Sequence, residues 1–205
     1  MFKIAVLVSG GGTNLQAIIN AIANNKLEDC IIDVVISSNS NAYALERAKE
    51  NNIDTFIISK KDFANPSDEI LKILNDRRID LIVLAGYLSI LKGNILKKYK
   101  NKIINIHPSL IPAFCGKDMY GIKVHESVIE SGVKITGCTV HYVNEGVDEG
   151  AIILQTPITV EDNDTPELLQ KRLLKYEHES LIKAIELISK NKLQVTKNKT
   201  RLIKE

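Results

Sequence analysis

Short apolar runs alternate with amphipathic stretches along the first half of the chain. Consecutive apolar positions are typical of strands buried on both faces of a parallel sheet, and such runs span residues 2–8, 31–37, 54–58, 80–85 and 103–106. Between the runs, apolar residues recur at helical spacing in 14–24 and 43–50, and a third helix begins at Asn65-Pro66. Strict alternation of strand and helix predicts right-handed βαβ units. We therefore expect an α/β fold with an open, mostly parallel sheet and helices on both faces.

The pattern changes after residue 108. The sequence then predicts a loop, a helix, two strands with a connecting loop, and a long helix that begins at Thr165-Pro166; these cover residues 108–119, 120–131, 135–143, 151–160 and 165–190. Two neighbouring strands with a short connection are expected to be antiparallel. We expect a single domain over residues 1–190, with an N-terminal half to about 107 and a C-terminal half over 108–190 that ends in the long helix.

Composition and charge narrow the class of protein. The chain has 205 residues, is 44% hydrophobic and 25% charged, and has a net charge of +2, values that exclude disordered, collagen-like and coiled-coil classes. No apolar run approaches the roughly 20 residues of a membrane span, and Ser9-Gly10 follows the first apolar run too soon for a signal peptide. The expected location is the cytoplasm. The spacing of Cys30, Cys115 and Cys138 predicts three reduced thiols.

Basic residues are concentrated in residues 191–205, which form a basic C-terminal tail. The charged residues of the tail are five basic and one acidic: Lys192, Lys197, Lys199, Arg201, Lys204 and Glu205. This leaves 22 basic and 24 acidic residues in 1–190. A body with this charge balance is not expected to bind nucleic acid, and a tail without interleaved aromatic residues is interpreted as a solvated segment.

A glycine-rich segment follows the first expected strand and opens the first helix. It reads Ser9-Gly10-Gly11-Gly12-Thr13-Asn14, and the free N–H groups and dipole at such a helix start favour an anion. The segment differs from the dinucleotide-binding pattern, because Leu15 replaces the third glycine, and it lacks the lysine of a P-loop. It is either a phosphate cradle or a turn that needs glycine only for close packing of strand and helix.

A histidine lies at the end of the last expected parallel strand, in Asn105-Ile106-His107-Pro108. Side chains alternate along a strand, so Asn105 and His107 point to the same side. The amide can donate a hydrogen bond to a developing oxyanion, and the imidazole can move a proton near neutral pH. A lone histidine is more often structural, but an Asn-x-His pair followed by a proline-bearing loop indicates a catalytic site.

Two carboxylates are further candidates. Asp148 lies in the acidic loop 144–150, which is either a solvated connection or a part of the site; beside His107 it would raise the pKa of the imidazole. Glu177 falls on the apolar stripe of the last helix, where it either pairs with a basic residue in the core or binds a polar group of a ligand. The remaining histidines lack metal-ligand spacing and are interpreted as surface or packing residues: His125, His141 and His178.

Five motifs are distributed along most of the chain, from residue 6 to residue 178. They are V-L-V-S-G-G-G-T-N-L-Q-A-I-I at residues 6–19, L-A-G-Y-L-S-I-L at 84–91, N-I-H-P-S-L-I-P at 105–112, H-Y-V-N-E-G-V-D-E-G-A-I-I-L-Q at 141–155 and the pair Glu177-His178. Together they resemble the phosphoribosylglycinamide formyltransferase family of purine synthesis. The histidine motif alone is shared with related formyl-folate enzymes. The resemblance implies the Rossmann-like formyltransferase fold, and it implies that the basic tail forms a short terminal strand or hairpin.

The resemblance also implies which residues bind the two substrates. Gly12, Thr13 and Asn14 would hold the phosphate of glycinamide ribonucleotide in the N-terminal half, and Glu177 would contact the same substrate. The co-substrate 10-formyltetrahydrofolate would be bound by Leu88, Ser89, Ile90, Leu91, Asn105, Asn144, Glu145, Gly146, Val147 and Asp148. Ser89 stands where many relatives carry an arginine, so Lys60 or Lys61 is expected to meet the folate carboxylates.

The implied reaction is direct attack of the ribonucleotide amine on the formyl carbon. Asn105 and protonated His107 would stabilise the tetrahedral intermediate, and Asp148 would sustain the imidazolium. The proton would pass from the amine to the folate nitrogen through water or His107, and no metal is implied. Two small molecules are the expected partners, with no nucleic acid and no membrane, for a monomer or homodimer.

Other functions use similar residues. A formyltetrahydrofolate hydrolase or a methionyl-tRNA formyltransferase would have a similar histidine and aspartate, but each usually carries an additional domain, for which this sequence is expected to have no residues. A non-catalytic phosphoribosyl-binding regulator would bind its ligand through residues 10–14 without turnover. The presence of Asn105, His107 and Asp148 argues against the regulator.

Overall fold

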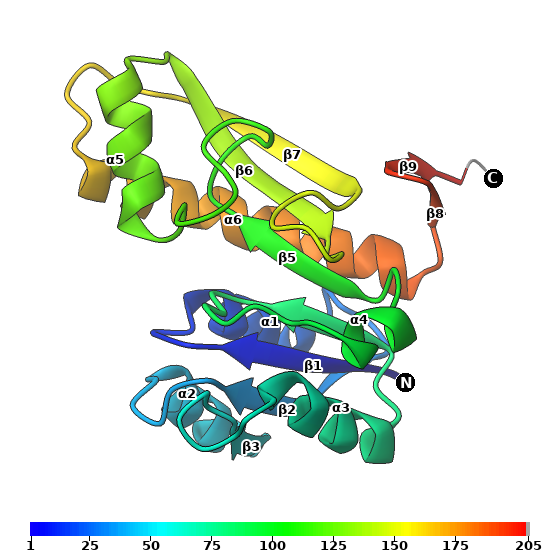
Figure 1. Ribbon diagram of the computed structural model, residues 1–205. Helices are drawn as coiled ribbons and strands as arrows, with labels where there is room; N and C mark the ends of the chain where they lie inside the picture. Colours follow the sequence, from blue (N-terminus) through cyan, green and yellow to red (C-terminus); the bar gives the residue numbers. More distant parts are fainter. Residues whose placement is uncertain (204–205) are drawn as a thin grey trace. The chain divides into compact units, whose positions relative to one another are not determined.

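A computed structural model describes residues 1–203 and separates the chain into two units. The first unit comprises residues 1–104, and the second begins at residue 105. In Figure 1 the first unit runs from blue to green and the second from green to red. Each unit is built around strands of the type that the sequence predicts for its half of the chain.

The first unit contains four parallel strands in the order β3-β2-β1-β4. Their bounds are β1 (Phe2–Val8), β2 (Cys30–Ser37), β3 (Asp54–Ile57) and β4 (Leu81–Leu84), and the helices are α1 (Thr13–Ala23), α2 (Ala44–Glu50), α3 (Pro66–Arg77) and α4 (Asn94–Lys98). The predicted alternation of strand and helix is confirmed. The sequence pattern did not predict α4, which has only five residues.

The order of the strands explains why both faces of this sheet are covered. The connections from β1 to β2 to β3 step in one direction, and the connection from β3 to β4 steps back, so right-handed crossovers place α1 and α2 on one face and α3 on the other. In agreement, α1 contacts α2, and α3 contacts α4. Residues Ile4 to Val8 consequently have no exposed surface. The reversal beside β1 leaves the carboxyl ends of β1 and β4 adjacent, which is where such sheets bind ligands.

The second unit has the strand order β5-β6-β7-β9-β8. Strand β5 (Ile103–His107) leads into it, followed by α5 (Ile122–Ser131), β6 (Ile135–Tyr142), β7 (Ile152–Thr159), α6 (Pro166–Ser189), β8 (Leu193–Thr196) and β9 (Lys199–Leu202). Strands β6 and β7 are antiparallel, and α6 packs on both of them and on α5. The antiparallel strands and the long final helix confirm the predicted fold class.

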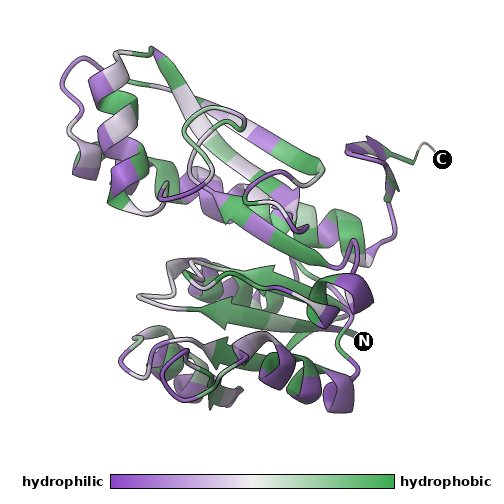
Figure 2. Ribbon diagram, viewed as in Figure 1, coloured by the Kyte–Doolittle hydropathy of each residue, from purple (hydrophilic) through white to green (hydrophobic). Residues whose placement is uncertain are grey.

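The basic tail forms the β8–β9 hairpin, in which Leu193 pairs with Leu202. Strand β9 adds to the edge of β7 through Ile152 and Lys199. Figure 2 shows that the strands of the first unit are almost continuously hydrophobic, whereas the hairpin is mostly hydrophilic. The expectation of a terminal hairpin is confirmed for these residues; Lys204 and Glu205 lie outside the described residues.

The two predicted proline-containing helix starts differ in their capping. At the start of α6, Oγ1 of Thr165 accepts a hydrogen bond from the N–H of Leu168 at 3.3 Å. Asn65 occupies the cap position of α3, but its side chain makes no capping bond and its Nδ2 donates to Asp68 Oδ2 at 2.5 Å. The three cysteines are free thiols. Within residues 1–203, no helix is both long and apolar enough to cross a membrane.

Candidate active site

The glycine-rich segment lies at the carboxyl end of β1. Gly12 has a φ of 73°, and a Cβ there would lie 2.6 Å from Cβ of Ala44. Close packing against α2 therefore requires glycine at this position. Gly10 and Gly11 differ, because a Cβ on either would meet nothing within 4 Å. The space beside Gly10 and Gly11 is open to a ligand. Gly12 instead fits the alternative in which glycine is needed only for close packing of strand and helix.

The carbonyl groups of the glycine-rich segment are bound by α2. Gly10 accepts from the N–H of Ala44 at 3.1 Å, and Gly11 accepts from Nε of Arg47 at 2.8 Å. The first N–H groups of a helix have no acceptor within it, so this segment can present N–H groups to an anion. Arg47 adds positive charge to the segment. No local sequence pattern marks this residue, because only the packing of α2 brings it there. Thr13 is exposed and Asn14 is buried in the first turn of α1.

The segment after β4 is joined to the glycine-rich segment. The N–H of Leu88 donates to Ser9 Oγ at 2.9 Å, and Ser9 Oγ is 2.6 Å from Ser38 Oγ. Leu88 and Ile90 are 61% and 64% exposed, so this segment offers apolar surface to solvent, whereas Leu91 is buried. Burial raises the pKa of Tyr87 to about 12, although its hydrogen bond with Ser89 lowers it.

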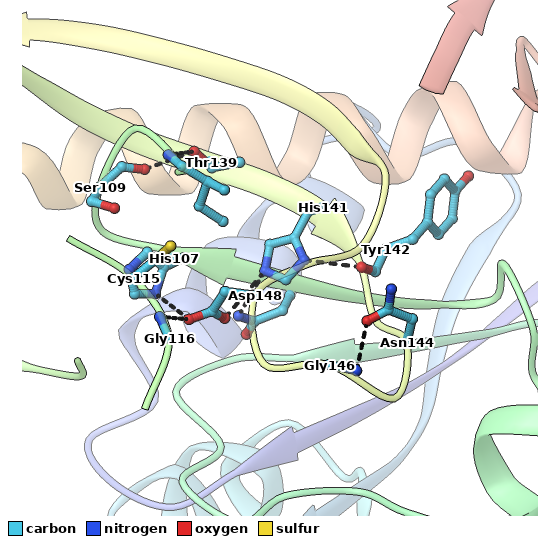
Figure 3. Close-up of polar contacts among 12 residues, drawn as sticks. His107, Ser109, Cys115, Gly116, Thr139, His141, Tyr142, Asn144, Gly146 and Asp148 are labelled. Atoms are coloured by element: carbon cyan, nitrogen blue, oxygen red, sulfur yellow. Dashed lines mark hydrogen bonds and ion pairs between the residues drawn. The ribbon is translucent and has the colours of Figure 1, made fainter. Parts of the chain in front are cut away.

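Four polar side chains come together in the second unit. Asn105 and His107 come from β5, His141 from β6, and Asp148 from the loop between β6 and β7. The Asp148 carboxylate lies between the two imidazoles, with Oδ2 at 3.6 Å from His107 Nδ1 and Oδ1 at 3.6 Å from His141 Nε2. Asn105 Nδ2 is 3.2 Å from His141 Nε2. Figure 3 shows Asp148 between the two histidine rings.

Main-chain groups of the loop after β5 hold two members of this cluster. His107 Nε2 is 2.9 Å from the carbonyl oxygen of Phe114, and the N–H of Gly116 donates to Asp148 Oδ2 at 2.9 Å. A carbonyl oxygen only accepts, so Nε2 of His107 carries a proton. In the neutral ring, Nδ1 is then the basic nitrogen, and it is the nitrogen nearer Asp148.

His141 also belongs to this cluster: it is buried, as a packing residue would be, and it contacts Asn105 and Asp148, which the sequence does not predict. Its Nδ1 is 2.9 Å from the carbonyl oxygen of Tyr142 and therefore carries a proton. Nε2 of the neutral ring then accepts from Asn105 Nδ2. Alternation along residues 135–143 places Thr139 and His141 on one face, but only the pairing of the strands shows which face meets the site.

Burial and charge set the ionisation of this cluster in opposite directions. Burial lowers the pKa of His107 below its ordinary value, more than the Phe114 carbonyl and Asp148 raise it. The expectation that Asp148 raises the pKa is right for its own contribution, but burial outweighs it. For Asp148, burial raises the pKa, yet the neighbouring His141, the Gly116 N–H and the His107 ring when it is charged bring it below the ordinary value. The resting pair is therefore a neutral imidazole and a carboxylate.

The loop that carries Asp148 is shaped by its own backbone. Asn144 Oδ1 accepts from the N–H of Gly146 at 3.0 Å, and Asp148 adopts a φ of 59°. A Cβ at Gly150 would lie 1.6 Å from the carbonyl oxygen of Tyr142, so the return of the chain to β7 requires glycine. Glu145 and Val147 are exposed on this loop.

Glu177 is buried on α6 with 7% of its surface exposed. It lies close enough to Cys138 to raise the pKa of that thiol, which burial foremost brings to about 11. Ser180, one turn further along α6, bonds to Thr156 at 2.7 Å. His125 is buried as a packing residue, and burial lowers its pKa to about 4. His178 is half-buried.

Comparison with known proteins identifies the family. The formyl transferase family matches residues 2–185. A trifunctional purine biosynthetic protein adenosine-3 from Gallus gallus is 39% identical over 94% of this chain, which spans 19% of that protein. A chloroplastic phosphoribosylglycinamide formyltransferase from Arabidopsis thaliana is 36% identical over 94% of this chain and 67% of that protein.

A solved structure extends the similarity to the whole fold. Glycinamide ribonucleotide transformylase 1 from Symbiobacterium toebii has a TM-score of 0.93 and 38% identity, covering 100% of this chain and 95% of that one. The sequence motifs, the fold and these comparisons agree. The chain belongs to the formyl transferase family and, within it, to the phosphoribosylglycinamide formyltransferases.

Proposed function

We propose that this chain transfers the formyl group of 10-formyltetrahydrofolate to the amine of glycinamide ribonucleotide. The observation that carries the proposal is the cluster of Asn105, His107 and Asp148, which joins an amide donor, a basic nitrogen and a carboxylate within one unit. These are the groups that acyl transfer to an amine requires. The proposed partners are two small-molecule substrates. We further propose that the protein acts in the cytoplasm as a monomer or homodimer.

Two features of the first unit suit the substrates. The open space at Gly10 and Gly11, with the nearby Arg47, fits the ribonucleotide phosphate, which Gly12, Thr13 and Asn14 would bind through the helix start. The exposed side chains of Leu88 and Ile90 fit the flat ring of a folate, which supplies the formyl group on its N10 atom. In the second unit, residues 144–148 would contact the folate and Glu177 the ribonucleotide. Lys60 or Lys61 would meet the folate carboxylates.

His107 acts as the base in the proposed mechanism. Its Nε2 proton is bonded to the Phe114 carbonyl, and the lowered pKa leaves Nδ1 free of a proton at neutral pH. Nδ1 takes the proton that the attacking amine loses as the new carbon–nitrogen bond forms, and it returns this proton to the nitrogen that leaves. The ring is charged only between these two transfers, and Asp148 stabilises it then. This order of proton transfers replaces the expectation that His107 is protonated from the start.

Asn105 stabilises the charge that develops on the formyl oxygen. Its amide has two hydrogens, and only one is directed to His141 Nε2. The second can be donated to the oxygen as its charge grows. His141 thus fixes the amide, while its own orientation is fixed by the Tyr142 carbonyl.

The test is a spectroscopic assay of folate release from 10-formyltetrahydrofolate, with and without glycinamide ribonucleotide. Release that requires both the ribonucleotide and His107, with His107→Ala inactive, supports the transferase. Release without the acceptor would identify a hydrolase instead. Ribonucleotide binding with no release under any condition would leave the non-catalytic regulator.

A further inference from the structure

The loop after β5 holds the catalytic pair by two main-chain groups, and a buried hydroxyl anchors the beginning of this loop. The Phe114 carbonyl accepts from His107, and the Gly116 N–H donates to Asp148, so these two groups lie one residue apart on either side of Cys115. A shift of this short segment would move both contacts together. The position of residues 114–116 therefore sets the geometry of the His107–Asp148 pair.

Thr139 fixes the beginning of that loop. Its Oγ1 donates to the Ser109 carbonyl at 2.7 Å and accepts from the N–H of Ile111 at 3.1 Å and from Gln155 Nε2 at 3.2 Å. A hydroxyl has one donor and two acceptor positions, so all three are used. Thr139 lies on β6, the strand that also carries His141, and Figure 3 shows its bond to Ser109.

Two further bonds extend this anchoring along the loop. Ser109 Oγ donates to the Ala113 carbonyl at 2.6 Å, and Gln155 Nε2 donates to the Ile111 carbonyl at 2.8 Å. Thr139 and Ser109 have no exposed surface, so water cannot replace the bonds between them without entering the core. The chain of bonds thus runs from Thr139 through Ser109 to Ala113, the residue before Phe114.

We propose that Thr139 is a positioning residue for formyl transfer: its hydroxyl fixes the 109–116 loop so that the Phe114 carbonyl and the Gly116 N–H hold His107 and Asp148 in the reactive arrangement. This inference rests on the proposed function. Thr139 touches neither member of the pair directly and acts through the loop.

The variant that tests the inference is Thr139→Val, which keeps the shape of the side chain and removes the hydroxyl. Thr136→Val is the matched control, because Thr136 is buried on the same strand and its Oγ1 has no hydrogen-bond partner among the described residues. Thr139→Ser keeps the hydroxyl and should restore the wild-type behaviour. All three are measured by steady-state kinetics and by NMR titration of the His107 ring.

We expect Thr139→Val to lower kcat by about 10- to 100-fold with little change in the KM of the ribonucleotide, because misplacement of a catalytic group affects the chemical step. The His107 titration should move to lower pH, because the ring loses part of its contact with the Phe114 carbonyl, one of the groups that raise its pKa. The other titratable groups acting on this ring or responding to it are Asp148, His141 and His125, and none is altered by the substitution.

Three results would overturn the inference. The first is a Thr139→Val protein with wild-type kcat and His107 titration; the second is an equal change in Thr136→Val; the third is failure of Thr139→Ser to restore either quantity. If Thr139→Val does not fold, Ser109→Ala removes only the bond to Ala113 and should shift the titration in the same direction by less, and an unchanged titration would then count against the inference. The titration needs no turnover, so an inactive wild-type chain would refute the proposed function alone.

Discussion

The two units offer ligands different kinds of polar group. In the first unit, the candidate binding groups belong to the backbone of the glycine-rich segment, at the end of a sheet with both faces covered. In the second unit, they are titratable side chains that backbone groups of a loop hold in place. In the first unit the candidate groups have a geometry that the fold already fixes, whereas the arrangement in the second depends on a few hydrogen bonds between distant parts of the chain.

The sharpest way to break this division is to change the chemistry of the second unit alone. Asp148→Asn removes the charge that stabilises the His107 cation, so kcat should fall about 10²- to 10⁴-fold while the dissociation constant of the ribonucleotide stays nearly constant. Kinetics and calorimetry measure the two quantities. Asp162→Asn, on an exposed ion pair with Lys134, is the control and should change neither. Equal losses in kcat and affinity would mean that Asp148 maintains the fold.

Substitutions in the first unit alone distinguish a glycine needed for packing from a glycine beside open space. Gly12→Ala should lower the free energy of unfolding by about 2 to 4 kcal/mol, because its backbone is left-handed and the new Cβ would strike Ala44. Gly11→Ala should leave stability within about 0.5 kcal/mol of the wild type and weaken ribonucleotide binding by about tenfold or more, since its Cβ would fill ligand space. Denaturant titration and calorimetry give both numbers. Unaltered affinity for the ribonucleotide in Gly11→Ala would show that the phosphate does not bind at this segment.

The pH dependence of kcat should report the second unit. His107 must be neutral to accept a proton, so kcat should be constant above its pKa and fall as the pH drops through that value, which burial places below the ordinary histidine value. Asp148 raises the His107 pKa, so in Asp148→Asn the acid limb should move to lower pH. Rate profiles of both proteins test the sign. Movement of the limb to higher pH would contradict the assignment of His107 as the base.

The smallest effect sharpens the comparison at the helix starts. Thr165→Ala removes a side-chain cap and should destabilise the protein by about 1 kcal/mol. Asn65→Ala at the start of α3 should cost only a few tenths of a kcal/mol, because Asn65 makes no capping bond. Thermal and denaturant unfolding of the two variants measure the difference. Equal destabilisation would show that the two caps are equivalent in solution.

The sheet of the first unit was readable from the sequence because burial on both faces leaves uninterrupted apolar runs such as Ile4 to Val8. The position of Asn105 and His107 on the same side of β5 could be predicted, because side-chain alternation along a strand is a local rule. Helix α4 was not, since five residues after a glycine carry too little periodicity.

The rest of the site depends on contacts that no local pattern encodes. His141 enters the cluster only because β6 places that face against Asn105 and Asp148. The net charge of His107 reflects a balance between burial and a neighbouring carboxylate, and the sequence gives the carboxylate but not the burial. Arg47 reaches the glycine-rich segment only through the packing of α2.

The outermost strands, β3 in the first unit and β8 in the second, have four residues each. An open strand edge is a template for a foreign strand, and short edges with charged side chains resist such pairing. Arg77 covers the ring of Phe56 on β3 and pairs with Asp54, while the hairpin that contains β8 carries Lys197 in its turn and Lys199 and Arg201 on β9. Both margins are therefore protected against fibrillar aggregation while the chain remains folded.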